Sequence, residues 1–189
     1  MTLTTIDPAA ALVVIDLQKG IVSALAGDPA TATVVKHASQ LAAEFRRHGL
    51  PVVLVNVNGR APGRTEVGWS GSGAALPADW TDLIDELDVR PTDHLITKRR
   101  RSAFHDTGLD TLLRDLGVTQ IVLAGISTSA GVESTARSAS DHGYHVVLAT
   151  DAMTDPDAEA HRHSVERVFP KLGETATSAE VAEKAEATR

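Results

Sequence analysis

The chain has 189 residues, 42% of them hydrophobic and 23% charged, a composition that suits one domain with a sizeable core. A net charge of −7 argues against a nucleic-acid partner or an anionic membrane surface, and the absence of cysteine excludes disulfides, thiolate metal sites and a cysteine nucleophile. We therefore expect one domain over residues 1–189, located in the cytoplasm.

Short apolar runs predict strands that alternate with longer stretches of helical periodicity. The first run ends at Asp16 and follows no basic segment, so it is interpreted as a buried strand rather than a signal or membrane anchor. The five predicted strands are residues 10–16, 51–57, 93–98, 119–126 and 145–151. A sixth, shorter strand is expected near residues 174–178.

Apolar residues at helical spacing predict helices between these strands. The predicted helices are residues 31–49, 107–118, 131–144, 157–169 and 178–187. The alternation predicts an α/β fold, a Rossmann-like doubly wound sheet of five to six mainly parallel strands with helices on both faces.

The segment 58–80 is rich in glycine and proline and is too long for a routine connection. We expect it to be a lid or a substrate loop. Arg60 and Arg64 are its only clear candidates for holding an anion. Trp69 is expected to line the pocket, and packing of this ring under the loop is an equally good alternative.

Polar side chains stand where the predicted strands end, which is where doubly wound sheets bind ligands. Asp16 ends the first strand, Asn56 the second and Lys98 the third. A buried carboxylate is costly unless it is paired or partly neutral, so we expect the Lys98 ammonium to hold Asp16 and set its protonation. An aspartate that only caps a neighbouring loop is the alternative. Arg99–Arg101 are expected at the surface, where one of them could steer a carboxylate.

The turn 125–131 follows the fourth strand and opens a helix, so its free backbone N–H groups could bind an anion or an oxyanion. Gly131 would let a substrate approach the backbone closely. The alternative is an ordinary turn in which Ser127, Thr128 or Ser129 caps the helix. A G-x-S-x-G elbow is absent, and the eight histidines show no spacing typical of metal ligands. Neither a metal nor a cofactor is predicted.

Three segments carry a family resemblance: residues 11–20, 96–155 and 161–174. In their order and content they resemble the isochorismatase-like hydrolase superfamily. The resemblance implies the Rossmann-like fold, a small-molecule substrate and a homodimer or larger homo-oligomer. Members that cleave amides carry an Asp–Lys–Cys triad, which falls here on Asp16, Lys98 and Gly131. A cis peptide of the family would correspond to Ile126–Ser127.

Because Gly131 replaces the cysteine, attack by a thiolate is impossible. By resemblance to family members with glycine here, we predict a hydrolase that acts by acid-assisted hydrolysis of an enol-ether type. Asp16 would be the general acid and Lys98 would orient it. The alternatives are a catalytically inactive small-molecule binding protein of the same fold and an amidase-family member that lacks its cysteine.

The predicted substrate contacts gather around these three residues. They are Gln18, Asn56, Trp69, Ile126, Ser127 and Ala130. Nicotinamidases of the superfamily bind a metal through an Asp-x-His motif at the second strand. Here that strand ends in Asn-Val-Asn, so the resemblance does not carry this metal site over.

Overall fold

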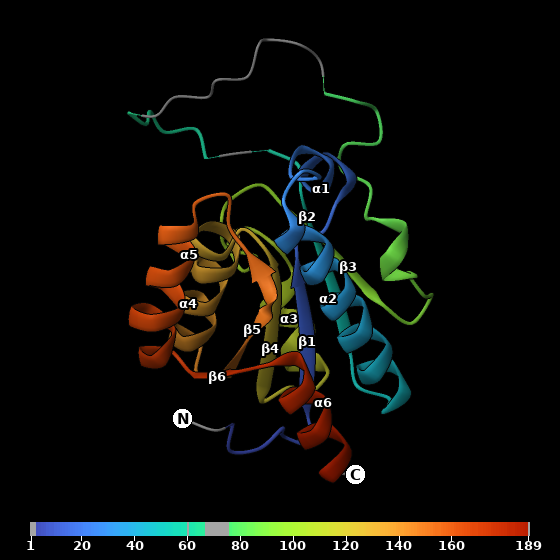
Figure 1. Cartoon of the computed structure of the whole chain (residues 1–189). Helices are drawn as coiled ribbons and strands as arrows, with labels where there is room; N and C mark the ends of the chain where they lie inside the picture. The colour runs from blue at the N-terminus through green and yellow to red at the C-terminus, as the bar shows by residue number, and fades with distance from the viewer. Residues whose placement is uncertain (1–2, 60, 67–75, 189) are drawn as a thin grey trace.

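The computed structural model describes residues 3–59, 61–66 and 76–188. Its six parallel strands form one sheet in the order β3-β2-β1-β4-β5-β6, which confirms the predicted doubly wound fold (Figure 1). The strands are β1 Ala10–Ile15, β2 Val52–Val57, β3 His94–Lys98, β4 Gln120–Ile126, β5 His145–Thr154 and β6 Glu174–Ala176. The strand order reverses between β1 and β4, the place where doubly wound sheets form their ligand sites.

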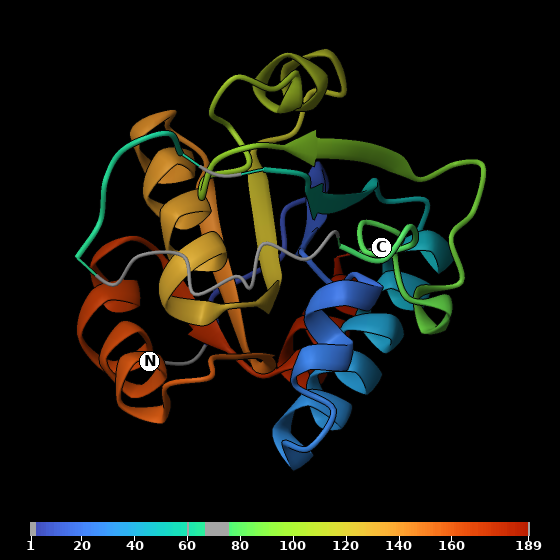
Figure 2. The ribbon, with the colours of Figure 1, turned by 90° about the horizontal axis from the view of Figure 1, so that it is seen from above.

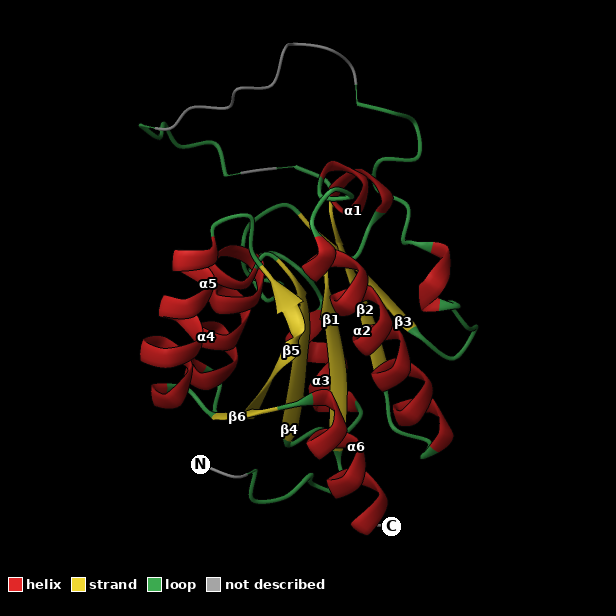
Figure 3. Cartoon of the chain, in the orientation of Figure 1, coloured by secondary structure: helices red, strands yellow, loops and turns green. Residues whose placement is uncertain are grey.

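The helices follow the predicted pattern with local differences (Figure 3). They are α1 Lys19–Ala24, α2 Pro29–Arg47, α3 Leu109–Asp115, α4 Glu133–Asp141, α5 Ala158–His163 and α6 Ser178–Ala187. Short 3-10 and π segments also occur: η1 Asp85–Leu87, η2 Thr128–Val132, η3 Ser164–Val168 and η4 Phe169–Lys171. The helix predicted over 157–169 begins as α5 and continues without a break as η3 and η4. Neither α1 nor η1 was predicted.

Each face of the sheet carries its own hydrophobic core. Alternate residues of β1 point to opposite faces, so Leu12 and Val14 join a core with Phe45 of α2, whereas Val13 and Ile15 join the other core. Helices α2 and α6 cover the first core, and α3 and α4 cover the second. Seen from above, α1 and α2 lie on one side of the sheet and α4 on the other (Figure 2).

The terminal helix α6 is fixed at its start and along one face. Thr177 and Glu180 form a reciprocal capping box, and Asp151 accepts hydrogen bonds from the backbone N–H and the hydroxyl of Ser178. Val181 and Ala185 are buried in the first core. No helix in the described ranges has both the length and the apolar content needed to cross a membrane.

Candidate active site

Asp16 follows β1 directly and turns its carboxyl toward the second core. Its φ is 53°, a left-handed conformation that aspartate tolerates better than most residues. Strict alternation along β1 would send the side chain after Ile15 to the first core, and the left-handed residue interrupts that alternation. The backbone N–H of Asp16 donates to the Val55 carbonyl at 2.8 Å, which holds this turn against β2.

Lys98, the last residue of β3, pairs with Asp16 as the sequence predicts. Its Nζ lies 2.7 Å from Asp16 Oδ2 and 3.2 Å from the Arg100 carbonyl oxygen. Only 2% of the Lys98 side chain and 6% of the Asp16 side chain are exposed. Two strands separated by β2 therefore meet at a buried ion pair.

The burial of this pair changes the proton affinity of Asp16. Loss of hydration raises the pKa of the Asp16 carboxyl from 3.8 to about 6, although the Lys98 ammonium acts in the opposite direction. Oδ1 of Asp16 is also buried and has no hydrogen-bond partner in the described part of the chain. One carboxyl oxygen is thus held by Lys98, and the other is available to carry a proton.

Gly131 lies directly against the pair. A β-carbon at this position would lie 2.9 Å from Ile15 Cγ2, 3.2 Å from Asp16 Oδ2 and 3.7 Å from Lys98 Nζ. The structure therefore brings together Asp16, Lys98 and Gly131, the three residues predicted to form the catalytic centre. A side chain at 131 would point into the space beside the carboxyl and the ammonium.

The turn before Gly131 is a π turn with several hydrogen bonds. The peptide bond Ile126–Ser127 is cis, and the Ser127 carbonyl accepts from the N–H groups of Ala130 and Val132, each at 3.2 Å. Asp155 Oδ2 accepts from both the N–H and the hydroxyl of Ser129, at 2.8 and 2.7 Å. Asp155, which sequence reasoning missed, follows β5 and fixes the turn from the neighbouring strand.

Thr135 is a second residue that sequence reasoning missed. Its hydroxyl donates to the Gly131 carbonyl at 2.7 Å and accepts from the Ala103 N–H at 3.0 Å. The link joins the segment after Lys98 to the helix after Gly131, so it fixes two sides of the site relative to each other. The spacing of four residues to Gly131 is the local signal, since helical threonine often bonds to the carbonyl one turn back.

Gln18 and Asn56 hold the ends of the long segment after β2. The buried Gln18 amide accepts from the Val57 N–H at 2.8 Å and donates to the carbonyls of Val57 and Trp80, at 3.3 and 3.0 Å. Asn56 Nδ2 donates to the Thr81 carbonyl at 2.8 Å, whereas its buried Oδ1 is unpaired. Substrate contact by Gln18 and Asn56 stays a prediction.

The other predicted substrate contacts differ in position. Ile126 is fully buried in the first core, whereas Ser127 and Ala130 are partly exposed. Trp69 and Arg60 lie outside the described residues. Binding of substrate by Ile126, Ser127, Ala130 and Trp69 stays a prediction.

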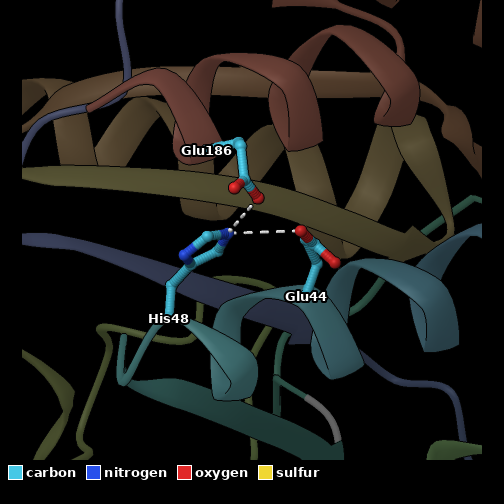
Figure 4. Close-up of side chains that lie close together, drawn as sticks. All are labelled: Glu44, His48 and Glu186. Carbon is cyan, nitrogen blue, oxygen red and sulfur yellow. Dashed lines mark hydrogen bonds and ion pairs between the residues drawn. The ribbon is translucent and has the colours of Figure 1, made fainter. Parts of the chain in front are cut away.

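A separate cluster of possible metal ligands lies far along α2 from the paired Asp16 and Lys98. Glu44, His48 and Glu186 bring ligand atoms within 4.8 Å of one another at the ends of α2 and α6 (Figure 4). The Arg47 guanidinium forms ion pairs with both carboxylates. Because the positively charged Arg47 side chain already pairs with both glutamates, we interpret the cluster as a set of ion pairs that holds α6 against α2.

Comparison with known proteins identifies the family. Residues 10–180 match the isochorismatase domain. The chain therefore belongs to the isochorismatase family of hydrolases. It is 41% identical over 180 residues to YwoC of Bacillus subtilis (strain 168), an uncharacterized isochorismatase family protein. The aligned region covers 92% of this chain and 93% of that protein.

Two further relatives extend the comparison. The fold matches an isochorismatase family protein from Burkholderia thailandensis with a TM-score of 0.88 and 38% identity, over 96% of this chain and 98% of that one. Ureidoacrylate amidohydrolase RutB of Pseudomonas syringae pv. syringae (strain B728a) is 32% identical over 170 residues, 75% of this chain and 69% of that protein. The relatives thus include an enzyme named for the hydrolysis of an amide.

Proposed function

We propose that this isochorismatase-family hydrolase cleaves a small molecule of the enol-ether type by acid catalysis, without a covalent nucleophile. The observation that carries the proposal is the Asp16 carboxyl, which is paired with Lys98 on one oxygen, unpaired on the other and raised in pKa to about 6. The chain has no cysteine, and glycine stands beside this carboxyl. A carboxyl with a pKa near the working pH is suited to donate a proton.

The proposed reaction begins with transfer of the Asp16 proton to the vinyl methylene carbon. A new C–H bond forms, and the positive charge is shared between the adjacent carbon and the ether oxygen. Water adds to that carbon and returns a proton to the Asp16 carboxylate. The hemiketal then collapses: the bond to the leaving alcohol breaks, the alcohol oxygen takes the hydroxyl proton, and a ketone remains. One water is consumed, and the acid is regenerated.

Lys98 and Gly131 have supporting roles in this scheme. The Lys98 ammonium holds Oδ2 and so leaves Oδ1 to carry the proton that is transferred. Its charge also stabilises the carboxylate that remains after proton transfer, while burial keeps the pKa of Asp16 above the usual range. Gly131 keeps side-chain atoms away from the acid, since even a β-carbon there would lie 2.9 Å from Ile15 Cγ2 and 3.2 Å from Asp16 Oδ2.

The test follows pyruvate release from isochorismate by purified protein, as wild type and as Asp16→Asn. We expect the amide variant to lose about three orders of magnitude in kcat/KM, because it keeps the shape of the side chain but cannot supply the proton. Asp85→Asn is the matched control, since the Asp85 side chain is 94% exposed and lies outside the site. Turnover that persists unchanged in Asp16→Asn would eliminate the proposed acid.

Hydrolysis of an amide is the second candidate, because a relative is named as an amidohydrolase. The variant Gly131→Cys separates the two reactions. A β-carbon here meets Asp16 and Lys98 at 3.2 and 3.7 Å, so a thiol would lie beside both with a small shift of Ile15. Amide hydrolysis that appears only in the variant leaves the enol-ether proposal intact. Amide hydrolysis by the wild type, without pyruvate release from isochorismate, contradicts it.

A further inference from the structure

A cavity of about 560 Å³ lies between α1, α2 and η1, on the side of the sheet that carries the first core. Most of its wall surface is apolar, although five of its nine lining residues are polar or charged. The lining residues are Val22, Ala26, Thr31, Ala32, Val35, Lys36, Ser39, Gln40 and Glu86. The volume falls within the range of small-molecule sites in proteins, which combine apolar walls with a few polar groups.

Two of the residues that line this cavity carry a buried hydroxyl without a partner. In the described ranges, four buried side-chain oxygens lack a hydrogen bond, and two of these are Thr31 Oγ1 and Ser39 Oγ. Only 3% of Thr31 is exposed. Buried hydroxyls are costly to leave unpaired, so two such groups about two turns apart on α2, at one cavity, require an explanation.

We propose that this cavity is a binding site for a small neutral molecule with an aliphatic or aromatic body and a carbonyl or hydroxyl oxygen. The body contacts Val22 and Val35, and the oxygen bonds to the Thr31 hydroxyl. Rotation about χ1 exchanges the hydroxyl and the methyl group of Thr31, and helical threonine uses both rotamers. The ligand is neutral because Lys36 and Glu86 bring opposite charges to the same lining. An apolar protein segment would leave the Thr31 hydroxyl unpaired.

The site is separate from the paired Asp16 and Lys98, which lie toward the second core. It does not depend on the proposed function. The neighbouring helix α1 contains Gly20, where a β-carbon would lie 2.0 Å from the Trp80 indole. The ring therefore packs directly on α1, and Trp80 fluorescence in a Trp69→Phe background reports movement of this helix.

The experiment is a titration of the full chain with cyclohexanone, followed by methyl NMR. We expect saturable shifts of the Val22 and Val35 methyl signals at millimolar probe, and weaker binding of protonated cyclohexylamine. Thr31→Val removes the hydroxyl at nearly constant shape. It should weaken cyclohexanone binding about fivefold and raise the Tm of the free protein, because an unpaired buried hydroxyl is lost.

Two further variants test the location. Ala32→Leu should fill the cavity and abolish the shifts. Ala182→Leu is the matched control, because Ala182 lines a different groove, between α2 and α6, and should bind the probe like the wild type. The proposal is overturned if the Val22 and Val35 signals show no saturable shift, or if Thr31→Val binds as tightly as the wild type. Shifts that follow protein concentration rather than probe also overturn it, because they mark a contact between copies.

Discussion

Two opposing effects act on the protonation of the Asp16 carboxyl. Burial favours the neutral acid, whereas the ammonium at 2.7 Å favours the carboxylate, and burial has the larger effect on the pKa of Asp16. The outcome is a carboxyl that is partly protonated near neutral pH. This balance is a property of the two side chains and their surroundings, so pH is the variable that tests it.

The rate should follow the protonated fraction of Asp16. We expect kcat/KM to be constant below about pH 6, the pKa of this carboxyl, and to fall about tenfold per pH unit above it. Lys98→Met removes the group that lowers the pKa of Asp16, so the pH above which kcat/KM begins to fall should be higher in that variant. A pH–rate profile of both proteins makes the comparison. A rate that instead rises through pH 6 would assign Asp16 the role of a base.

The same pKa shift has a consequence for stability, with a definite sign. The folded state binds the Asp16 proton more tightly than the unfolded state, where the pKa is near 3.8. Between these two values the contribution of Asp16 to folding becomes less favourable as pH rises, and above about pH 6 the loss is complete. The site therefore keeps a carboxyl that weakens the fold at neutral pH, as expected for a group retained for chemistry.

At the level of elements, the backbones of β1 and β4 approach so closely at Gly125 that only glycine fits at this position. Gly125 has a φ of 120°, and a β-carbon there would lie 2.0 Å from the Ile15 carbonyl oxygen. The close contact positions Asp16, the next residue after Ile15, relative to the turn that leads to Gly131. The two halves of the candidate site are thus aligned by backbone packing.

Gly125→Ala should therefore lower the free energy of unfolding by more than about 3 kcal/mol, because it combines a forbidden conformation with a clash against backbone. Urea denaturation followed by circular dichroism measures the change. Gly27→Ala is the control: apart from its neighbours in the chain, no described atom lies within 4 Å of the added β-carbon, so the stability should stay close to that of the wild type. A stable Gly125→Ala protein would contradict this account of the β1–β4 contact.

The sequence predicts the strands and the pairing of Asp16 with Lys98 because both follow from local patterns. Five apolar runs define the sheet, and in a parallel sheet the carboxyl ends of β1 and β3 lie on the same side. Asp155 and Thr135 were missed, because neither ends a predicted strand: Thr135 lies within a helix, and Asp155 follows a strand that was predicted to end at residue 151. Helix α1 was missed because six residues are too few to show a helical period.

At the scale of the whole molecule, β3 leaves one edge of the described sheet without a neighbouring strand. Leu95 on this strand is 63% exposed, and Val89 just before it is 44% exposed. Apolar side chains on an open edge are typical of surfaces that bind another chain. We therefore retain the expectation of a homodimer or larger homo-oligomer and place the contact at this edge.

Light scattering after size exclusion should give a mass of at least about twice the 19.9 kDa of one chain. Leu95→Lys should shift the distribution toward the monomer, because it puts a charge into the apolar contact. Leu116→Lys, at another exposed leucine on the far end of α3, should leave the mass unchanged. A monomeric wild type at micromolar concentration would refute the assignment.

Gln18 gives the molecule one more property. A single buried amide binds the chain both where it leaves the sheet, at Val57, and where it returns, at Trp80. Whatever length and composition lie between these two points, the departure and the arrival are fixed by the same side chain. We therefore expect that a segment of different size can be exchanged between these two points without disturbing the pairing of Asp16 with Lys98.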